Sequence, residues 1–155
     1  RGHSLRVTNL LGAAFMNEHD PSNPFKALDE IIEKNEHKVH IVDFHAEATG
    51  EKYAIALDFD GKVSAVLRKH THIQTVDVRI FENRTGFISD VGMTGPYNSI
   101  IGCKKEEVIY RNRYGLPSRF DVATGVAQVC AVVLDIDEEN GKTTNIERIY
   151  LIDND

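Results

Sequence analysis

The sequence is poor in cysteine. Its 155 residues include only Cys103 and Cys130, which lie far apart and form no Cys-x-x-Cys pair. Disulfide-stabilised proteins usually carry several closely spaced cysteines, so a disulfide framework is not indicated. We expect two free, buried thiols in a protein of the reducing cytoplasm.

Long apolar runs are also missing. No stretch approaches the roughly 18 consecutive apolar residues of a membrane-spanning helix, and the first residues lack the apolar core of a signal peptide. The sequence therefore predicts a protein without a membrane segment.

Positive charge is in deficit. The chain carries 18 Lys and Arg against 24 Asp and Glu, a formal net charge of −6. This balance gives no electrostatic reason to expect strong nucleic-acid binding or attachment to a membrane surface. It does not exclude a nucleotide substrate, because metal ions can neutralise a phosphate. The length and the 41% hydrophobic content fit one soluble domain over residues 1–155.

The first half of the chain alternates strand and helix patterns. Strands are indicated at residues 5–11, 39–44 and 63–67, with helices after Pro24 and at residues 51–57. Ser22 or Asn23 is the expected N-cap of the first helix, and Pro24 suits its first position. This order predicts a right-handed α/β crossover unit with parallel strands.

The second half indicates antiparallel pairing. A hairpin, a Gly-rich loop and a short helix are indicated at residues 78–89, 90–97 and 104–111. Two longer strand patterns, 127–136 and 145–152, flank Asn140-Gly141, a strong hairpin-turn signal. We predict a layered α/β protein with a mixed first sheet and an antiparallel second sheet.

Three histidines follow the ends of two predicted parallel strands. His45 comes directly after residues 39–44, and His70 and His72 follow residues 63–67 as a His-Thr-His step. Residues i and i+2 of an extended segment point to the same side, and the carboxyl ends of neighbouring parallel strands meet at one crevice. Imidazole is the commonest protein ligand of transition metals. The pattern predicts a metal site at His45, His70 and His72, with unrelated polar loop residues as the alternative.

The neighbours of these histidines are weaker candidates. Paired-metal sites also need carboxylates, and Asp43 and Glu47 are the nearest to His45 in sequence. We expect Asp43 to face away from His45 and to be structural. Glu47 would orient an imidazole, cap a helix or lie in solvent. The residues alone indicate no catalytic or substrate-binding side chain. The remaining histidines are expected to be ordinary surface or strand residues: His3, His19, His37 and His40.

Three segments carry a longer and more specific pattern. They are residues 43–52 (DFHAEATGEK), 70–75 (HTHIQT) and 89–97 (SDVGMTGPY). In order and spacing they resemble the bacterial YmdB-like proteins, which are calcineurin-like metallophosphoesterases with cyclic-nucleotide phosphodiesterase activity. The resemblance extends from about Leu5 to the end of the chain.

The resemblance implies a layered α/β/β/α sandwich of the metallophosphoesterase type with two metal ions, usually iron or manganese. It also implies that His45 and His70 bind one ion and that His72 binds the other. The expected reaction is the hydrolysis of a small phosphodiester whose oxygens are held by both ions.

Two departures from the family pattern affect what we expect of this chain. Arg68-Lys69 stand where the family has Gly-Thr; such cations would repel a metal if they pointed toward it, or would help to hold a substrate phosphate. The family's N-terminal Gly-Asp, Gly-Glu-Asn and Gly-Asn-His motifs are missing, and the chain begins with Arg1. We therefore expect a fragment or processed product: a partial copy of the fold that lacks the N-terminal half and associates with it. Its exposed apolar sheet surface would favour a homo-oligomer.

Two functional hypotheses follow. In the first, the full-length parent is a metal-dependent phosphodiesterase for cyclic nucleotides or related phosphodiesters, and this chain supplies the C-terminal histidine ligands. In the second, the chain is a non-catalytic fragment or degenerate module that folds and oligomerises without a functional metal centre. The missing carboxylates and Arg68-Lys69 favour the second hypothesis for the chain in isolation.

Overall fold

The computed structural model describes residues 4–16 and 23–153 of the chain. In chain order the elements are β1 (Leu5–Leu11), α1 (Pro24–Glu33), β2 (Val39–His45), α2 (Thr49–Asp58), β3 (Ala65–Lys69), β4 (Arg79–Ile80), β5 (Gly86–Phe87), β6 (Gly95–Pro96), α3 (Lys105–Tyr114), β7 (Ala127–Ile136) and β8 (Thr143–Ile152). Asn23 is the N-cap of α1, and its side-chain oxygen accepts hydrogen bonds from the backbone N–H groups of Phe25 and Lys26. The other candidate cap, Ser22, lies outside the described residues.

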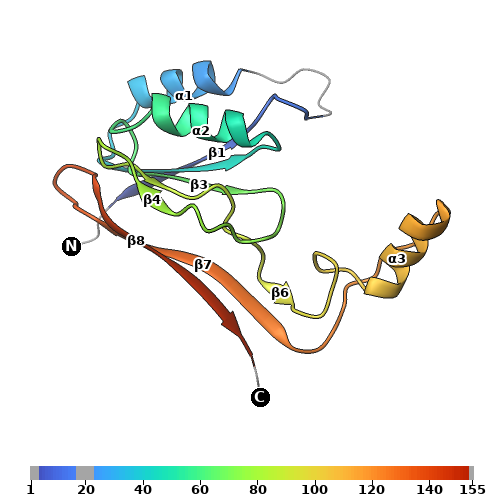
Figure 1. The fold of residues 1–155 in the computed structure, drawn as a ribbon. Coiled ribbons are helices and arrows are strands. Elements are labelled where there is room, and N and C mark those ends of the chain that lie inside the picture. The colour runs from blue at the N-terminus through green and yellow to red at the C-terminus, as the bar shows by residue number, and fades with distance from the viewer. Residues whose placement is uncertain (1–3, 17–22, 154–155) are drawn as a thin grey trace.

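The first sheet has the strand order β1-β2-β3-β5-β4. β1, β2, β3 and β5 are parallel, and β4 is antiparallel to β5. This arrangement confirms the predicted mixed sheet. Helices α1 and α2 lie side by side over one face of the sheet (Figure 1). Leu28 and Ile55 from these helices are fully buried, in one cluster with Val42, Phe44 and Phe59.

The second sheet has the order β6-β7-β8 and is antiparallel, as predicted. Gly141 in the β7–β8 turn has φ +73°, a left-handed conformation that glycine adopts without steric cost. β8 packs against β4 and β5, and the second sheet lies on the side of the first sheet away from the helices (Figure 1). The Thr143 hydroxyl joins the two sheets by donating a 2.6 Å hydrogen bond to the carbonyl of Ser64.

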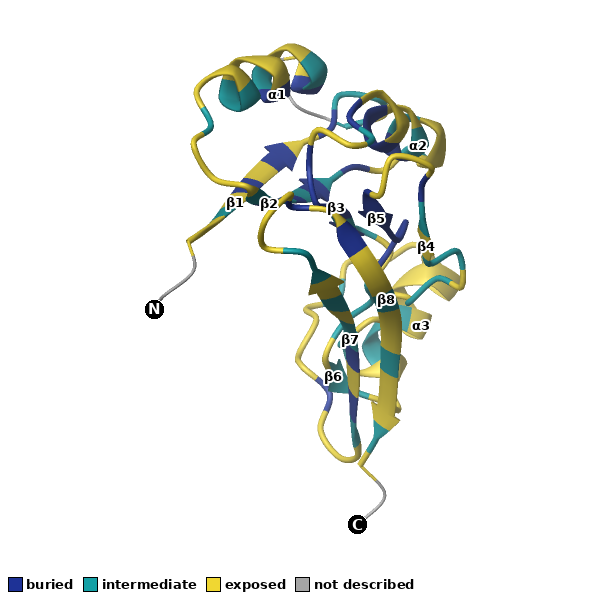
Figure 2. Ribbon diagram, turned by 90° about the vertical axis from the view of Figure 1, so that its left-hand side faces the viewer, coloured by how far each residue is buried: buried dark blue, intermediate teal, exposed yellow. Residues whose placement is uncertain are grey.

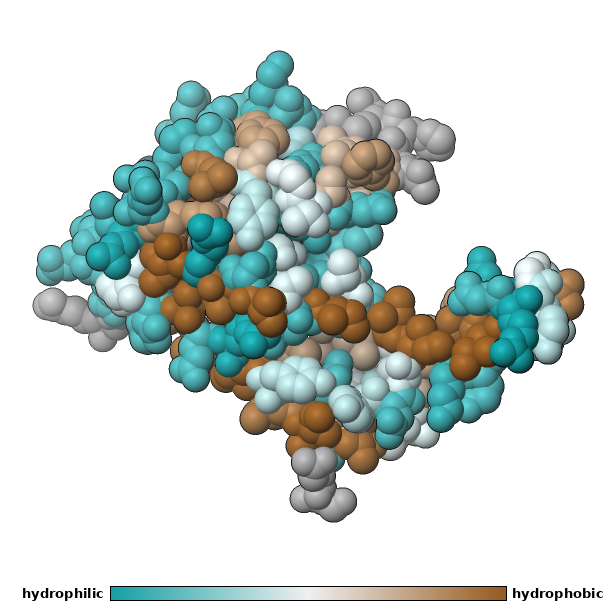
Figure 3. Space-filling model, viewed as in Figure 1, coloured by the Kyte–Doolittle hydropathy of each residue, from teal (hydrophilic) through white to brown (hydrophobic). Residues whose placement is uncertain are grey.

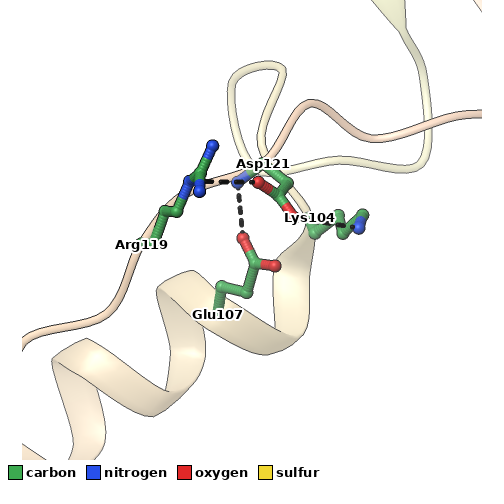
Figure 4. A network of polar contacts seen from close by, with 4 residues as sticks. All are labelled: Lys104, Glu107, Arg119 and Asp121. Atoms are coloured by element: carbon green, nitrogen blue, oxygen red, sulfur yellow. Dashed lines mark hydrogen bonds and ion pairs between the residues drawn. The ribbon is translucent and has the colours of Figure 1, made fainter.

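The segment between β6 and β7, residues 97–126, forms an arm that carries α3 away from both sheets (Figure 1). No residue of α3 is buried. The base of this helix is held by Asp121, whose backbone N–H donates a 2.6 Å hydrogen bond to Glu107 and whose carboxylate lies 3.3 Å from Lys104 and 3.7 Å from Arg119 (Figure 4). Local polar contacts rather than a shared core therefore hold α3.

The two faces of the first sheet differ in burial (Figure 2). Along β2, residues His40, Val42 and Phe44 are buried under the helices, whereas the residues between them and His45 are half-buried. We call these the covered face and the open face. Val7 on the open face is 63% exposed. Apolar side chains form a band across the molecule and out along the arm (Figure 3).

Both cysteines are free thiols, as predicted, but the predicted burial holds only for Cys130, since Cys103 is half-buried. None of the helices within residues 23–153 combines the length and hydropathy that a membrane span requires.

Candidate metal centre

His45 and His70 come together at the ends of two neighbouring strands. His45 is the last residue of β2 and pairs in register with Lys69, the last residue of β3, so His70 begins the following turn. Nε2 of His45 lies 3.2 Å from Nδ1 of His70. Their rings meet edge to face at 72°, with centroids 5.1 Å apart. The structure thus places two of the three predicted residues in direct contact.

The two nitrogens share a hydrogen bond, in which one ring donates its N–H and the other accepts, so a metal would have to displace that hydrogen. Their separation is close to that of two ligands of one metal ion. With metal–nitrogen bonds of 2.0–2.1 Å and tetrahedral angles, two ligand nitrogens lie roughly 3.3 Å apart. Burial lowers the pKa of His45, and the neighbouring charges of His70 and Lys69 lower it further. Because a neutral imidazole is the form that binds metals, this environment favours the ligand state of His45.

His72 does not join the pair. It is exposed, and its φ of +65° turns the chain into a left-handed conformation just after His70 and Thr71. Among residues 4–16 and 23–153, no group of three or more His, Cys, Asp or Glu side chains is arranged to hold a metal ion. The described residues therefore fit a metal through two donors only.

Asp43 occupies the same face as His45, so our expectation that it faces away was wrong. Adjacent strand residues face opposite sides, but Asp43 and His45 are two positions apart and share the open face. The Asp43 carboxylate accepts a 3.0 Å hydrogen bond from Asn9 Nδ2 and lies 3.4 Å from Lys69 Nζ. Glu47 is exposed and is not the N-cap of α2, which is Ala48.

Arg68 and Lys69 point to opposite faces of the sheet. Arg68 is 1% exposed on the covered face, with its guanidinium carbon 4.4 Å from the centroid of the Phe44 ring. None of its side-chain nitrogens has a hydrogen-bond partner among the described residues. Burial lowers the pKa of Arg68 to about 9, so the group keeps its charge at neutral pH. Only Lys69 shares the open face with the histidine pair, and the charge of Asp43 partly neutralises it.

The other described histidines lie away from this pair. His40 is buried on the covered face, and its Nε2 lies 2.8 Å from the hydroxyl of Thr8. Burial lowers the pKa of His40 to about 4, with smaller contributions from Arg6 and His37. His37 is exposed, with Nδ1 3.0 Å from the Ser4 hydroxyl. His3 and His19 lie outside the described residues.

Two polar residues near the pair were missed by the sequence interpretation. Asp90 is fully buried and accepts hydrogen bonds from the backbone of the His70-Thr71 turn. Nε2 of Gln74 donates 3.1 Å hydrogen bonds to the carbonyl oxygens of Ala131 and Ile149. These two hydrogen bonds tie the turn to the second sheet. Both residues lie in the segments that carry the family resemblance, Gln74 in residues 70–75 and Asp90 in residues 89–97, but no role was assigned to either.

Comparison with known proteins identifies related chains. A sequence profile described as YmdB-like protein matches residues 1–149. A Bacillus subtilis protein named 2′,3′-cyclic-nucleotide 2′-phosphodiesterase is 45% identical over 154 residues, which are 98% of this chain and 58% of that protein. Two crystal structures share the fold. A hypothetical protein from Thermus thermophilus matches with a TM-score of 0.86 and 38% identity over 94% of this chain and 56% of its own. A novel phosphatase from Mycoplasma pneumoniae matches with a TM-score of 0.87 and 39% identity, over 94% of this chain and 52% of the phosphatase chain. The chain thus spans little more than half the length of these relatives.

Proposed function

Because this chain belongs to the YmdB-like protein family, we propose that it contributes to the active site of a phosphodiesterase for cyclic nucleotides or related small phosphodiesters. One relative is named a 2′,3′-cyclic-nucleotide 2′-phosphodiesterase and another a phosphatase. Both names describe the cleavage of a phosphate ester. The contact between His45 and His70 at the open face carries the proposal, because it brings together one imidazole nitrogen from each of two neighbouring strand ends.

His45 and His70 would hold one ion, iron or manganese, and His72 would hold a second. Bound metal ions would polarise the phosphate and stabilise the negative charge that develops on its oxygens. The protein groups have separate tasks. His45 favours its neutral form, because burial and nearby cations lower its pKa. Lys69 lies beside the pair and can attract an anionic substrate to the open face.

We also propose that the protein works in the cytoplasm and self-associates. The two free thiols support the reducing compartment. Exposed apolar side chains on the second sheet, among them Val129, Val133 and Leu151, support association.

The proposal is tested with the complete product of the gene, assayed on 2′,3′-cyclic nucleotides with added Mn²⁺. His45→Ala and His70→Ala should each lower kcat/KM by about 100-fold or more, because each removes a metal ligand. His37→Ala is the matched control, since His37 is exposed and makes only a local contact with Ser4. Full activity in His45→Ala would refute the proposal.

The second candidate function is a non-catalytic module. It is favoured by one observation: in the described residues, no third side chain completes a metal site with His45 and His70. Elemental analysis of the purified chain separates the two candidates. Near-stoichiometric iron, manganese or zinc would argue against the non-catalytic module, whereas metal-free protein that stays inactive after metal addition would favour it.

A further inference from the structure

Asp90 is a buried carboxylate that is saturated with hydrogen bonds from the histidine turn. Its side chain is 0% exposed. Oδ2 accepts hydrogen bonds from the backbone N–H of His70 at 3.0 Å, the backbone N–H of Thr71 at 2.7 Å and the Thr71 hydroxyl at 2.7 Å. Oδ1 accepts a fourth from the N–H of Gly92 at 2.8 Å. Three of the four donors therefore belong to the His-Thr-His step.

The backbone of Asp90 is fixed as firmly as its side chain. Its N–H donates a 3.0 Å hydrogen bond to the Thr75 hydroxyl, and the N–H of Thr75 donates a 3.0 Å hydrogen bond to its carbonyl. Gly92 allows the close packing that follows, because a Cβ there would lie 3.0 Å from Cys130 and 2.9 Å from the backbone nitrogen of Gln74. Asp90 is thus a fixed point to which both ends of the turn are tied.

The turn needs such a fixed point. His72 adopts φ +65°, a conformation that costs a non-glycine residue about 1 kcal/mol or more and persists only when its surroundings impose it. The negative charge of Asp90 also acts on two buried cations. Burial lowers the pKa values of Lys52 and Arg68, and the charge of Asp90 acts in the opposite direction on both.

We propose that Asp90 is a positioning residue that sets the direction of His70, so that His70 Nδ1 meets His45 Nε2. The Asp90 carboxylate accepts hydrogen bonds from the N–H groups of His70 and Thr71 and so fixes the backbone conformation at His70. The backbone conformation in turn sets the direction in which the imidazole of His70 points. The metal-binding consequence rests on the proposed function. The contact between the two rings does not, because it stands on the geometry of the two side chains alone.

The first test is the ring contact in the metal-free chain, measured as nuclear Overhauser effects between the His45 and His70 imidazoles. Asp90→Asn places an amide NH₂ group opposite N–H donors, so the turn should shift and the effects between the rings should disappear. Asp60→Asn is the matched control, because Asp60 also accepts three hydrogen bonds, from Asn83 and Thr85, in a different turn. Retention of the ring contact in Asp90→Asn would overturn the proposal.

The second test is Zn²⁺ affinity, measured by competition with a chelator. Asp90→Asn should weaken binding by about 10- to 100-fold, the usual cost of losing a group that orients a metal ligand, while Asp60→Asn should stay within about 2-fold. Equal weakening in both variants would show a merely structural role and overturn the proposal. If the unaltered chain binds no Zn²⁺ but Asp90→Asn still loses the ring contact, positioning is supported and the metal part of the proposed function fails.

Thr71→Val keeps the test valid if Asp90→Asn does not fold. This change removes the hydroxyl, which donates the 2.7 Å hydrogen bond to Asp90 and makes longer, 3.3 Å hydrogen bonds with the backbone of Ile73, and it leaves the shape of the side chain nearly unchanged. The ring effects should weaken and Zn²⁺ affinity should fall by only about 2- to 5-fold, because the hydrogen bonds from the His70 and Thr71 N–H groups to the Asp90 carboxylate remain. Unchanged ring effects would count against the role of Asp90.

Discussion

Two histidines of one strand, His40 and His45, show how the faces of the first sheet differ. His40 lies under the helices, contacts the hydroxyl of Thr8, and its pKa is lowered to about 4 by burial. His45, five residues later, lies on the open face against a second imidazole. The same residue type therefore serves as a neutral core group on one face and as a candidate ligand on the other. Position on the pleat, rather than residue type, decides which role applies.

The adjacent cations Arg68 and Lys69 repeat this contrast. Arg68 lies buried over the Phe44 ring, whereas Lys69 is exposed and pairs with Asp43. The departure from the family pattern therefore places one cation in the core and one beside the candidate site. The covered face should tolerate little change, and the open face should tolerate more.

The largest expected effect is the loss of Phe44 from the covered face. Phe44→Ala should lower the free energy of unfolding by about 3–5 kcal/mol, because it leaves a cavity and removes the ring that faces the charge of Arg68. His45→Ala, one position along the strand, should cost less than about 1 kcal/mol. Urea denaturation of both variants measures the difference. Similar losses would contradict the separation of the two faces.

The next effect is a pH dependence of stability that His40 produces. Its pKa is about 4 in the folded chain against 6.5 for an unperturbed histidine, so the unfolded chain binds more protons between these values. The stabilisation is complete above about pH 6.5 and is lost as the pH falls toward 4, with about 2 kcal/mol lost between pH 7.5 and pH 5. Denaturation curves at these two pH values should show a smaller drop for His40→Leu than for the unaltered chain. His37→Leu is the control and should show the same drop as the unaltered chain. If His40→Leu also loses as much free energy of unfolding between pH 7.5 and pH 5 as the unaltered chain, His40 is not a buried neutral group.

The smallest effect is expected from the exposed pair on the open face. Lys69→Met should change the free energy of unfolding by no more than about 0.5 kcal/mol, since exposed ion pairs contribute little. The same change should raise the pKa of His45, because the charge of Lys69 contributes to lowering it. An imidazole NMR titration measures this shift. A lower pKa of His45 in Lys69→Met would contradict the assigned geometry.

Hydrophobic patterning was sufficient to predict most of the fold. The predicted strand 5–11 has the same bounds as β1, and the pairing of Ala127–Ile136 with Thr143–Ile152 follows from Asn140-Gly141. These signals are local, because strand alternation and turn residues occupy neighbouring positions. The arm is different. α3 has no apolar face to pack, which accounts for its position away from the sheets, but the sequence interpretation predicted only the helix and did not use this signal.

The site was predicted only in part. Parallel pairing brings the ends of β2 and β3 together, which is why the contact of His45 and His70 was predictable. Asp90 was missed because its hydrogen bonds reach a turn 20 residues earlier in the chain, and no local pattern records such a contact. The direction of His72 was also unpredictable, because an extended His-x-His step was assumed and the structure instead has a left-handed residue there.

The most direct test of the central claim follows all the imidazole nitrogens of the chain by NMR during a Zn²⁺ titration. The claim is that the open face binds a metal through His45 and His70 while the covered face does not. Resonances of His45 and His70 should shift together and saturate at about one equivalent of Zn²⁺, whereas those of the buried His40 should stay unchanged. Resonances of His45 that remain unchanged at saturating Zn²⁺ would contradict the claim.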